Sequence, residues 1–109
     1  MIGNRYEQVI HARIRNGCSN LKCDLFRNHL ENNTNCVCGH NFEDAEHYFF
    51  RCPKFNEQRL QLFRNTRPFH PLSTHKLLYG IDIKSVDENI KLFEEVQHFI
   101  KTTKRFSPN

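Results

Sequence analysis

The stretch that decides the fold is residues 36–53, CVCGHNFEDAEHYFFRCP. It contains four residues of metal-binding type in a C-x-C-x8-H-x4-C pattern, namely Cys36, Cys38, His47 and Cys52. Zinc prefers four soft or borderline ligands in a tetrahedron, and three cysteines with one histidine are a common structural set. Gly39 accepts the positive φ that a sharp turn after two thiolates often requires. The pattern therefore predicts a closed Zn²⁺ site.

The spacing of the last two candidate ligands requires a break in the chain. On one continuous α-helix, residues five positions apart, such as His47 and Cys52, point about 140° apart. Pro53 disfavours helical geometry at the residue before it. We therefore expect a corner at Cys52, between two helices, that turns its thiol back toward the other ligands.

Other cysteines and histidines leave alternatives open. His40 can replace His47 as a ligand, but it lies two residues after Cys38 and is expected at the surface or beside the site. Cys18 and Cys23 flank the start of the second helix and are expected to pack in the core, and free cysteines in general are common small buried side chains. The remaining histidines are scattered and are expected to be structural: His11, His29, His70, His75 and His98.

Length and composition favour a single small domain that needs a metal. The chain has 109 residues, of which 38% are hydrophobic, so its core is expected to be thin. Ten phenylalanines add buried area, and a structural zinc contributes about 10–16 kcal/mol in small domains. We expect one domain over 1–109, with an N-terminal helix pair (1–33), a knuckle (34–53) and C-terminal helices (54–109).

Apolar spacing and capping residues predict an all-α class of about five or six helices organised around the knuckle, with no strand pattern or repeat. We expect helices over 5–15, from Asn20 through Leu30, over about 43–51 after Asn41 or Asp44, from Pro53 through about Arg64, from Ser73 or Thr74 to Gly80, and after Ser85. Polar residues 31–35 and the segment between Pro68 and Pro71 are expected to be loops.

The last helix is expected to be the longest. Residues 85–88 have the S-x-x-E form of a capping box. The predicted apolar stripe consists of Val86, Ile90, Phe93, Val96 or Gln97, and Ile100, widened by Leu92 and Phe99.

Charge is distributed unevenly along the chain. The net charge is +4 overall, −2 over residues 32–53 and +3 over residues 54–71. We interpret residues 54–71, with Lys54, Arg59, Arg64 and Arg67, as a candidate phosphate-facing segment. The alternative is an ordinary solvated helix face.

Several classes of protein are excluded by the sequence. The longest apolar stretch is far shorter than the roughly 20 residues of a membrane-spanning helix, so no membrane association is expected. The first residues lack an apolar signal-peptide region, which favours an intracellular location, nuclear or cytoplasmic, with reduced cysteines. A zinc hydrolase or deaminase is disfavoured, because four protein ligands leave no open position and H-E-x-x-H is absent.

The same residues resemble a known family. Cys36-Val37-Cys38-Gly39, then Glu43-Asp44-Ala45-Glu46-His47, Cys52-Pro53 and Arg59-Leu60 resemble the CCHC zinc-knuckle region at the C-terminal end of non-LTR (LINE-type) retrotransposon reverse transcriptases. Residues 12–15, Leu21 and the ending at 99–106 resemble the flanks of that region more weakly, so the resemblance covers nearly the whole chain. Asp44 stands where the family usually has threonine, which preserves a capping side chain.

The resemblance implies that Cys36, Cys38, His47 and Cys52 are the zinc ligands. It also implies a role in gripping template RNA or target DNA beside an upstream polymerase. It implies no catalysis, because the paired aspartates of the polymerase and the residues of an endonuclease are absent from this sequence. The chain therefore resembles a C-terminal fragment of such a reverse transcriptase.

Two functions are compared. In the first, a non-catalytic zinc module binds RNA or DNA weakly and electrostatically, with Tyr48 as an example of an exposed aromatic that stacks on bases. The expected phosphate contacts are Arg13, Arg15, Lys54, Arg59, Arg64 and Arg67. In the second, zinc only joins helices, and the apolar stripe of the last helix docks another protein. The residues alone slightly favour docking, and the resemblance favours nucleic-acid binding.

Overall fold

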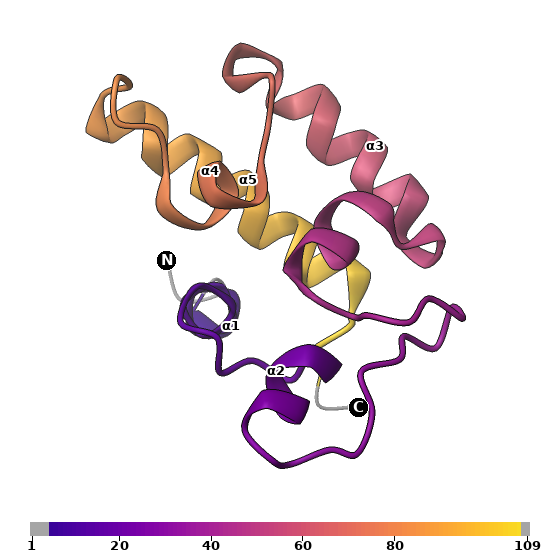
Figure 1. Ribbon diagram of the computed structural model, residues 1–109. Helices are drawn as coiled ribbons and strands as arrows, with labels where there is room; N and C mark the ends of the chain where they lie inside the picture. Colours follow the sequence, from indigo (N-terminus) through magenta and orange to yellow (C-terminus); the bar gives the residue numbers. More distant parts are fainter. Residues whose placement is uncertain (1–4, 108–109) are drawn as a thin grey trace.

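The computed structural model describes residues 5–107, and within them the chain forms helices and loops without a strand (Figure 1). The expected all-α class is confirmed. The α-helices are α1 (Arg5–Arg15), α2 (Lys22–Arg27), α3 (Asn56–Asn65), α4 (Thr74–Tyr79) and α5 (Val86–Thr103). A π-helical turn, η2 (His47–Arg51), and two 3-10 turns, η3 (Pro53–Phe55) and η4 (Arg67–Phe69), lie between them.

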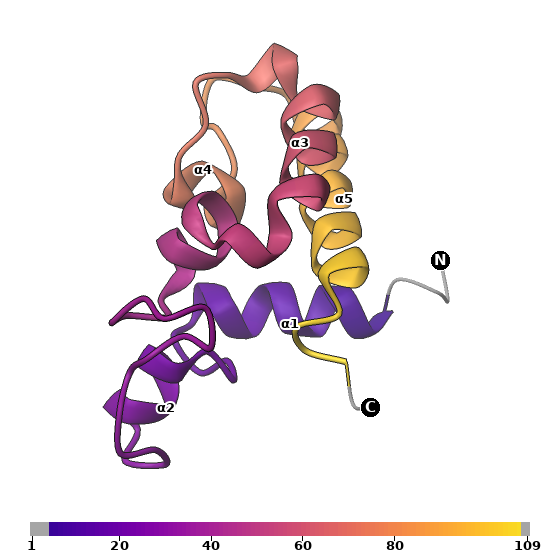
Figure 2. The same cartoon turned by 90° about the vertical axis from the view of Figure 1, so that its right-hand side faces the viewer.

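The long helix α5 organises the molecule. It packs against α1, α3 and α4. Figure 2 shows α3 and α5 side by side and antiparallel, with α1 crossing beneath them and α2 set apart at the lower edge. The loop of residues 34–43 lies between α2 and the rest of the molecule, so the predicted ligands lie where the N-terminal and C-terminal parts meet.

The core beside this junction is aromatic. The ring of Tyr48 lies 5.0–5.5 Å from the rings of Phe49, Phe55, Phe99 and Phe106, distances at which aromatic rings attract one another. The Tyr48 hydroxyl also pairs with Thr103 Oγ1 at 2.7 Å. The π turn is therefore anchored to α5 through its own aromatic side chain.

Helices with local capping signals form as expected. Ser85 accepts a hydrogen bond from the Glu88 amide, and the Glu88 carboxylate accepts one from the Ser85 amide, which completes the predicted capping box. Ser73 caps α4, and Gly80 follows it with a φ of 84°. The predicted first helix is confirmed over Arg5–Arg15.

The second helix differs from its prediction at both ends. Asn20 is not its cap: α2 begins after Leu21, and the Lys22 amide donates to the carboxylate of Glu43. The helix ends at Arg27, and His29 adopts a φ of 62°, so the helix cannot continue to Leu30. The Leu30 side chain is 73% exposed rather than buried. A distant carboxylate sets the start of α2, and local sequence does not show it.

The predicted stripe of α5 is correct only in its later turns. Val86 and Ile90 are exposed, by 76% and 49%. The side chain of Asn89 bonds both the amide and the carbonyl of Ile81, so the chain before α5 packs against a different face of its first turns. The buried face consists of Leu92, Val96, Phe99 and Ile100.

Candidate metal centre

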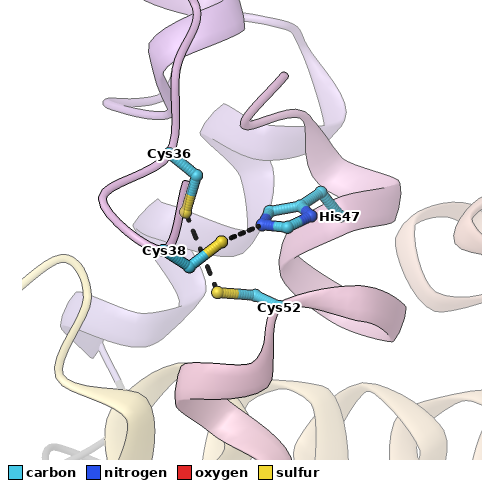
Figure 3. A group of neighbouring side chains, drawn as sticks. All are labelled: Cys36, Cys38, His47 and Cys52. Atoms are coloured by element: carbon cyan, nitrogen blue, oxygen red, sulfur yellow. Dashed lines mark hydrogen bonds between the residues drawn. The ribbon is translucent and has the colours of Figure 1, made fainter. Parts of the chain in front are cut away.

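The four predicted ligands lie together in one cluster. One donor atom from each of Cys36, Cys38, His47 and Cys52 lies within 4.8 Å of all the others. Figure 3 shows their side chains converging on one point, with the two cysteines of the loop facing His47 and Cys52. Cys36 Sγ lies 3.8 Å from Cys52 Sγ, and Cys38 Sγ lies 3.3 Å from His47 Nε2. This cluster can hold one metal ion.

A tight turn aims the first two thiols. The Gly39 amide donates to the Cys36 carbonyl at 3.0 Å, and the Cys36 amide donates to the His40 carbonyl at 2.9 Å. Gly39 has a φ of 103°, and a Cβ built on it meets no atom within 4 Å. The glycine is thus required for backbone conformation and not for space, as the sequence predicts.

A π turn brings His47 and Cys52 together. The Cys52 amide donates to the His47 carbonyl at 2.7 Å, an i to i+5 hydrogen bond. Such a turn is wider than a turn of α-helix, so residues five apart lie closer to one face than they would on an α-helix, and π turns are frequent at functional sites. Cys52 then leaves the helical region, with φ −63° and ψ 120°. The predicted corner before Pro53 is confirmed, but the π turn supplies a large part of the rotation.

Asp44 fixes the start of this turn. Its Oδ1 accepts a hydrogen bond from the His47 amide at 2.8 Å, the geometry of an N-terminal cap. Of the two predicted caps, Asn41 and Asp44, the structure selects Asp44. The cap and a metal ligand are therefore three residues apart on the same short segment.

His40 is a neighbour of the cluster and not one of its donors. Its ring stacks on that of His47, with centroids 4.5 Å apart and planes inclined by 6°. Burial, and next the charge of His40, lower the pKa of His47. The lower pKa favours the neutral imidazole that a metal requires.

The environments of two thiols differ. Burial raises the pKa of Cys36 to about 12. A hydrogen bond from the His40 backbone lowers the pKa of Cys38. A cation at the centre would favour the thiolate form at both positions, since coordinated thiols are deprotonated.

An ion pair between Glu43 and Arg105 lies beside the cluster, next to Cys36. Arg105 donates to both carboxylate oxygens of Glu43, at 2.7 Å each, and Glu43 Oε2 lies 3.9 Å from Cys36 Sγ. Burial acts to raise the pKa of Glu43, but hydrogen bonds from Arg105 and from the Lys22 amide hold it below its usual value. The pair joins the chain after α5 to the loop that carries Cys36. The sequence offers no local signal for it, because its partners are 62 residues apart.

Arg59 is not available to phosphate, which corrects the prediction made for it. It is 6% exposed, and its guanidinium donates to the carbonyls of Phe49 and Tyr48 at 2.8 and 3.1 Å. The π turn presents these carbonyls, and Arg59 ties α3 to them. Tyr48 is 1% exposed, so the expectation that it stacks on bases is also wrong.

The other basic candidates lie at or near the surface. Arg13, Lys54, Arg64 and Arg67 are exposed. Arg15 is half-buried and donates to the Leu78 carbonyl at 2.9 Å. Arg64 and Arg67 line the same surface hollow, whereas Arg13 lies on α1.

The two remaining cysteines lie outside the cluster. Cys18 is exposed and Cys23 is half-buried, and neither forms a disulfide. The core position expected for Cys18 is therefore wrong.

In comparisons with known proteins, no family model matches the chain, and neither a curated protein nor a solved structure matches it significantly. The likeness of residues 36–53 to the reverse-transcriptase knuckle stays a resemblance. No helix within residues 5–107 is both long enough and apolar enough to span a membrane.

Proposed function

We propose that the chain is a non-catalytic zinc module that binds single-stranded or duplex nucleic acid through basic residues beside the metal centre. The observation that carries the proposal is the convergence of Cys36, Cys38, His47 and Cys52 on one point, next to a segment of net charge +3. The resemblance to the C-terminal region of non-LTR retrotransposon reverse transcriptases supports the choice of partner.

Zinc is the metal that suits this donor set, and two of the separations between donor atoms are those expected around it. For Zn–S bonds of about 2.3 Å in a tetrahedron, two sulfurs lie about 3.8 Å apart, and a sulfur and a nitrogen lie about 3.5 Å apart. The corresponding separations are 3.8 Å for Cys36 to Cys52 and 3.3 Å for Cys38 to His47. Three thiolates and one imidazole are soft ligands of the kind that select zinc.

Four protein ligands make the site structural. They leave no coordination position for water or substrate, so the ion holds the loop to the π turn and performs no chemistry. We expect the purified chain to show neither polymerase nor nuclease activity. Metal-dependent primer extension that copurifies with the chain through rigorous purification would contradict this.

Nucleic-acid contacts are expected to come from the flanks of the centre. Three thiolates exceed the charge of Zn²⁺ by one, so the centre itself attracts phosphate poorly. Arg59 is buried, and among the predicted phosphate contacts the exposed residues are Arg13, Lys54, Arg64 and Arg67. Two to four neutralised phosphates give weak binding with little sequence preference.

A salt titration tests the proposal. Binding of single-stranded RNA to the zinc-loaded chain should weaken with salt, with a log–log slope of about −1.4 to −2.8, at about −0.7 per phosphate. An Arg64→Ala, Arg67→Ala double variant should bind less tightly and have a shallower slope. A slope near zero, or a double variant that equals the wild type, contradicts nucleic-acid binding by this route.

Protein docking is the second candidate, and one surface favours it. Ile83, just before α5, and Val86 and Ile90 in its first turns are exposed by 91%, 76% and 49%; a contiguous apolar patch of this kind would be a protein contact surface. The upstream polymerase of a full-length element is a partner that the resemblance suggests. A flat salt titration, with retained zinc, would favour this function.

A further inference from the structure

We infer that a surface hollow at the end of α3 is a binding site for a base and phosphate of single-stranded nucleic acid. The hollow is lined by Leu60, Phe63, Arg64, Arg67 and His70. This inference rests on the nucleic-acid-binding function proposed above. It adds where the nucleic acid binds and that the bound form is a single strand.

The hollow presents flat rings. His70 is exposed, and its ring meets that of Phe63 edge-on, with centroids 6.0 Å apart and planes at 86°. The His70 ring is held in place by a contact of 3.3 Å between its Nε2 and Thr66 Oγ1. Leu60 at the rim is 62% exposed. Such a surface offers a face and an edge for an unstacked base, which aromatic side chains bind without regard to sequence.

A second hollow adjoins the first. It is lined by Phe50 and Leu72 together with the same Phe63 and His70. The rings of Phe50 and Phe63 lie 6.0 Å apart at an angle of 32°. The two hollows thus form one aromatic surface that continues from α3 to the π turn. We call the two together the aromatic hollow.

The charged residues that line the aromatic hollow are positive, which favours the binding of phosphate. Arg64 and Arg67 line it, and no Asp or Glu is among its lining residues. Two other hollows on the described surface do contain carboxylates: one is lined by Glu88, Glu94 and Glu95 with Lys91, and the other by Glu7 with Lys101 and Lys104. Cations beside aromatic rings are the combination that binds single strands, whose bases are free to leave the stack.

The metal centre shapes this hollow. Phe50 lies on the π turn between the ligands His47 and Cys52. Arg59 joins the same turn to α3 by its bonds to the carbonyls of Phe49 and Tyr48, which places Phe50 against Phe63. Zinc that fixes His47 and Cys52 therefore also fixes one wall of the aromatic hollow.

The experiment compares variants of the full zinc-loaded chain by fluorescence anisotropy. The probes are a labelled ten-nucleotide RNA, the same strand with abasic ribose at its central positions, and a duplex of equal length. Phe63→Leu keeps an apolar side chain in the half-buried position. His70→Ala removes a ring that is exposed, so we expect both variants to fold like the wild type. Phe93→Leu and the double variant Lys91→Ala, Lys101→Ala are the matched controls outside the hollow. Circular dichroism and zinc content show that each variant is folded.

The expected results separate stacking from charge. Phe63→Leu should weaken binding to the single strand about fivefold or more, with an unchanged salt slope, because stacking releases no counterions. His70→Ala should weaken it by about threefold or more. Loss of Arg64 and Arg67 should make the slope shallower by about 1.4. The controls should stay within about twofold, and the abasic strand, which can stack on neither ring, should bind the wild type at least as weakly as the intact strand binds Phe63→Leu.

Three outcomes overturn the inference. If the wild type shows salt-dependent RNA binding but Phe63→Leu and His70→Ala leave it unchanged, the aromatic hollow is wrong and the proposed function stands. If the duplex or the abasic strand binds as tightly as the single strand, no base enters the hollow. If the wild type binds no RNA at all, both this inference and the proposed nucleic-acid-binding function are wrong, and protein docking becomes the candidate function.

Discussion

Cys52 is the most deeply buried of the four candidate ligands, and it lies at the end of the π turn. We expect Cys52→Ser to lower zinc affinity more than about 100-fold, since even residues behind a ligand cost 10- to 100-fold when changed. Competition with a zinc-binding dye measures this. Cys18→Ser, at an exposed position, should retain wild-type affinity, and equal affinity in both variants would refute the ligand assignment.

His11 predicts a pH dependence of stability. Burial, the largest influence, lowers its pKa below 6.5, and its ring contacts the Leu77 carbonyl and the Gln97 side chain at 2.8 and 3.1 Å. Below the unfolded-state pKa, the unfolded chain binds a proton that the folded chain resists, so stability falls as pH falls from about 6.5 toward the folded-state pKa.

Urea unfolding at pH 7.5 and 5.5 tests this, with His11→Gln as the comparison. The wild type should lose more free energy of unfolding between the two pH values than the variant. The metal centre is common to both proteins, so their difference isolates His11. Equal losses would show that His11 does not titrate between the two states in this range.

The clustering of Cys36, Cys38, His47 and Cys52 and the helix caps were predictable from local sequence, whereas long-range partners were not. The Cys3His set follows from its spacing, and Gly39 follows from the turn that the spacing requires. Arg59 was misassigned because a basic residue on a helix is usually solvated, and nothing local shows that the π turn presents carbonyls to it. Tyr48 was misassigned for the same reason, since its burial depends on α5 and the chain after it.

The ion pair of Glu43 and Arg105 fastens the chain after α5 to the loop of residues 34–43. Its side chains are 5% and 21% exposed, and breaking a buried pair from one side costs about 3–5 kcal/mol. Because Arg105 is partly solvated, we expect Glu43→Gln to lower the free energy of unfolding by about 3 kcal/mol, as measured by urea denaturation.

Glu46→Gln is the control for this change. Glu46 pairs with Arg51 at 3.3 Å, but both side chains are more than half exposed, so its loss should change stability by less than about 1 kcal/mol. If the two variants had the same free energy of unfolding, the ion pair of Glu43 and Arg105 would not stabilise the contact between the chain after α5 and the loop of residues 34–43.

Elements with local signals were predicted well. The helices α1, α4 and α5 form where apolar spacing and, for α4 and α5, local caps predict them, although the first turns of α5 do not bury the predicted stripe. The start of α2 was not predictable, because the carboxylate of Glu43 accepts the amide of Lys22 from 21 residues away. The π turn was expected only as a short helix, since its i to i+5 bonding depends on the positions of His47 and Cys52 in the cluster.

At the scale of the molecule, the candidate metal centre connects the loop of residues 34–43 to the core, of which Cys36 and Cys52 are themselves part. Away from the cluster, the core lies where α5 packs against α1, α3 and α4. We therefore expect removal of zinc by a chelator to abolish amide protection in residues 34–43, while the buried face of α5 retains slow exchange. Hydrogen exchange detected by mass spectrometry measures both regions. Unchanged protection of the loop would mean that zinc does not hold it.

The central claim is that the Cys3His cluster holds one zinc ion, and elemental analysis tests it most directly. The chain is purified under reducing conditions, without chelators, and its metal content is measured against protein concentration. We predict one zinc per chain that persists through dialysis, in keeping with a closed four-ligand site. A chain that is folded but contains no stoichiometric metal would contradict the account.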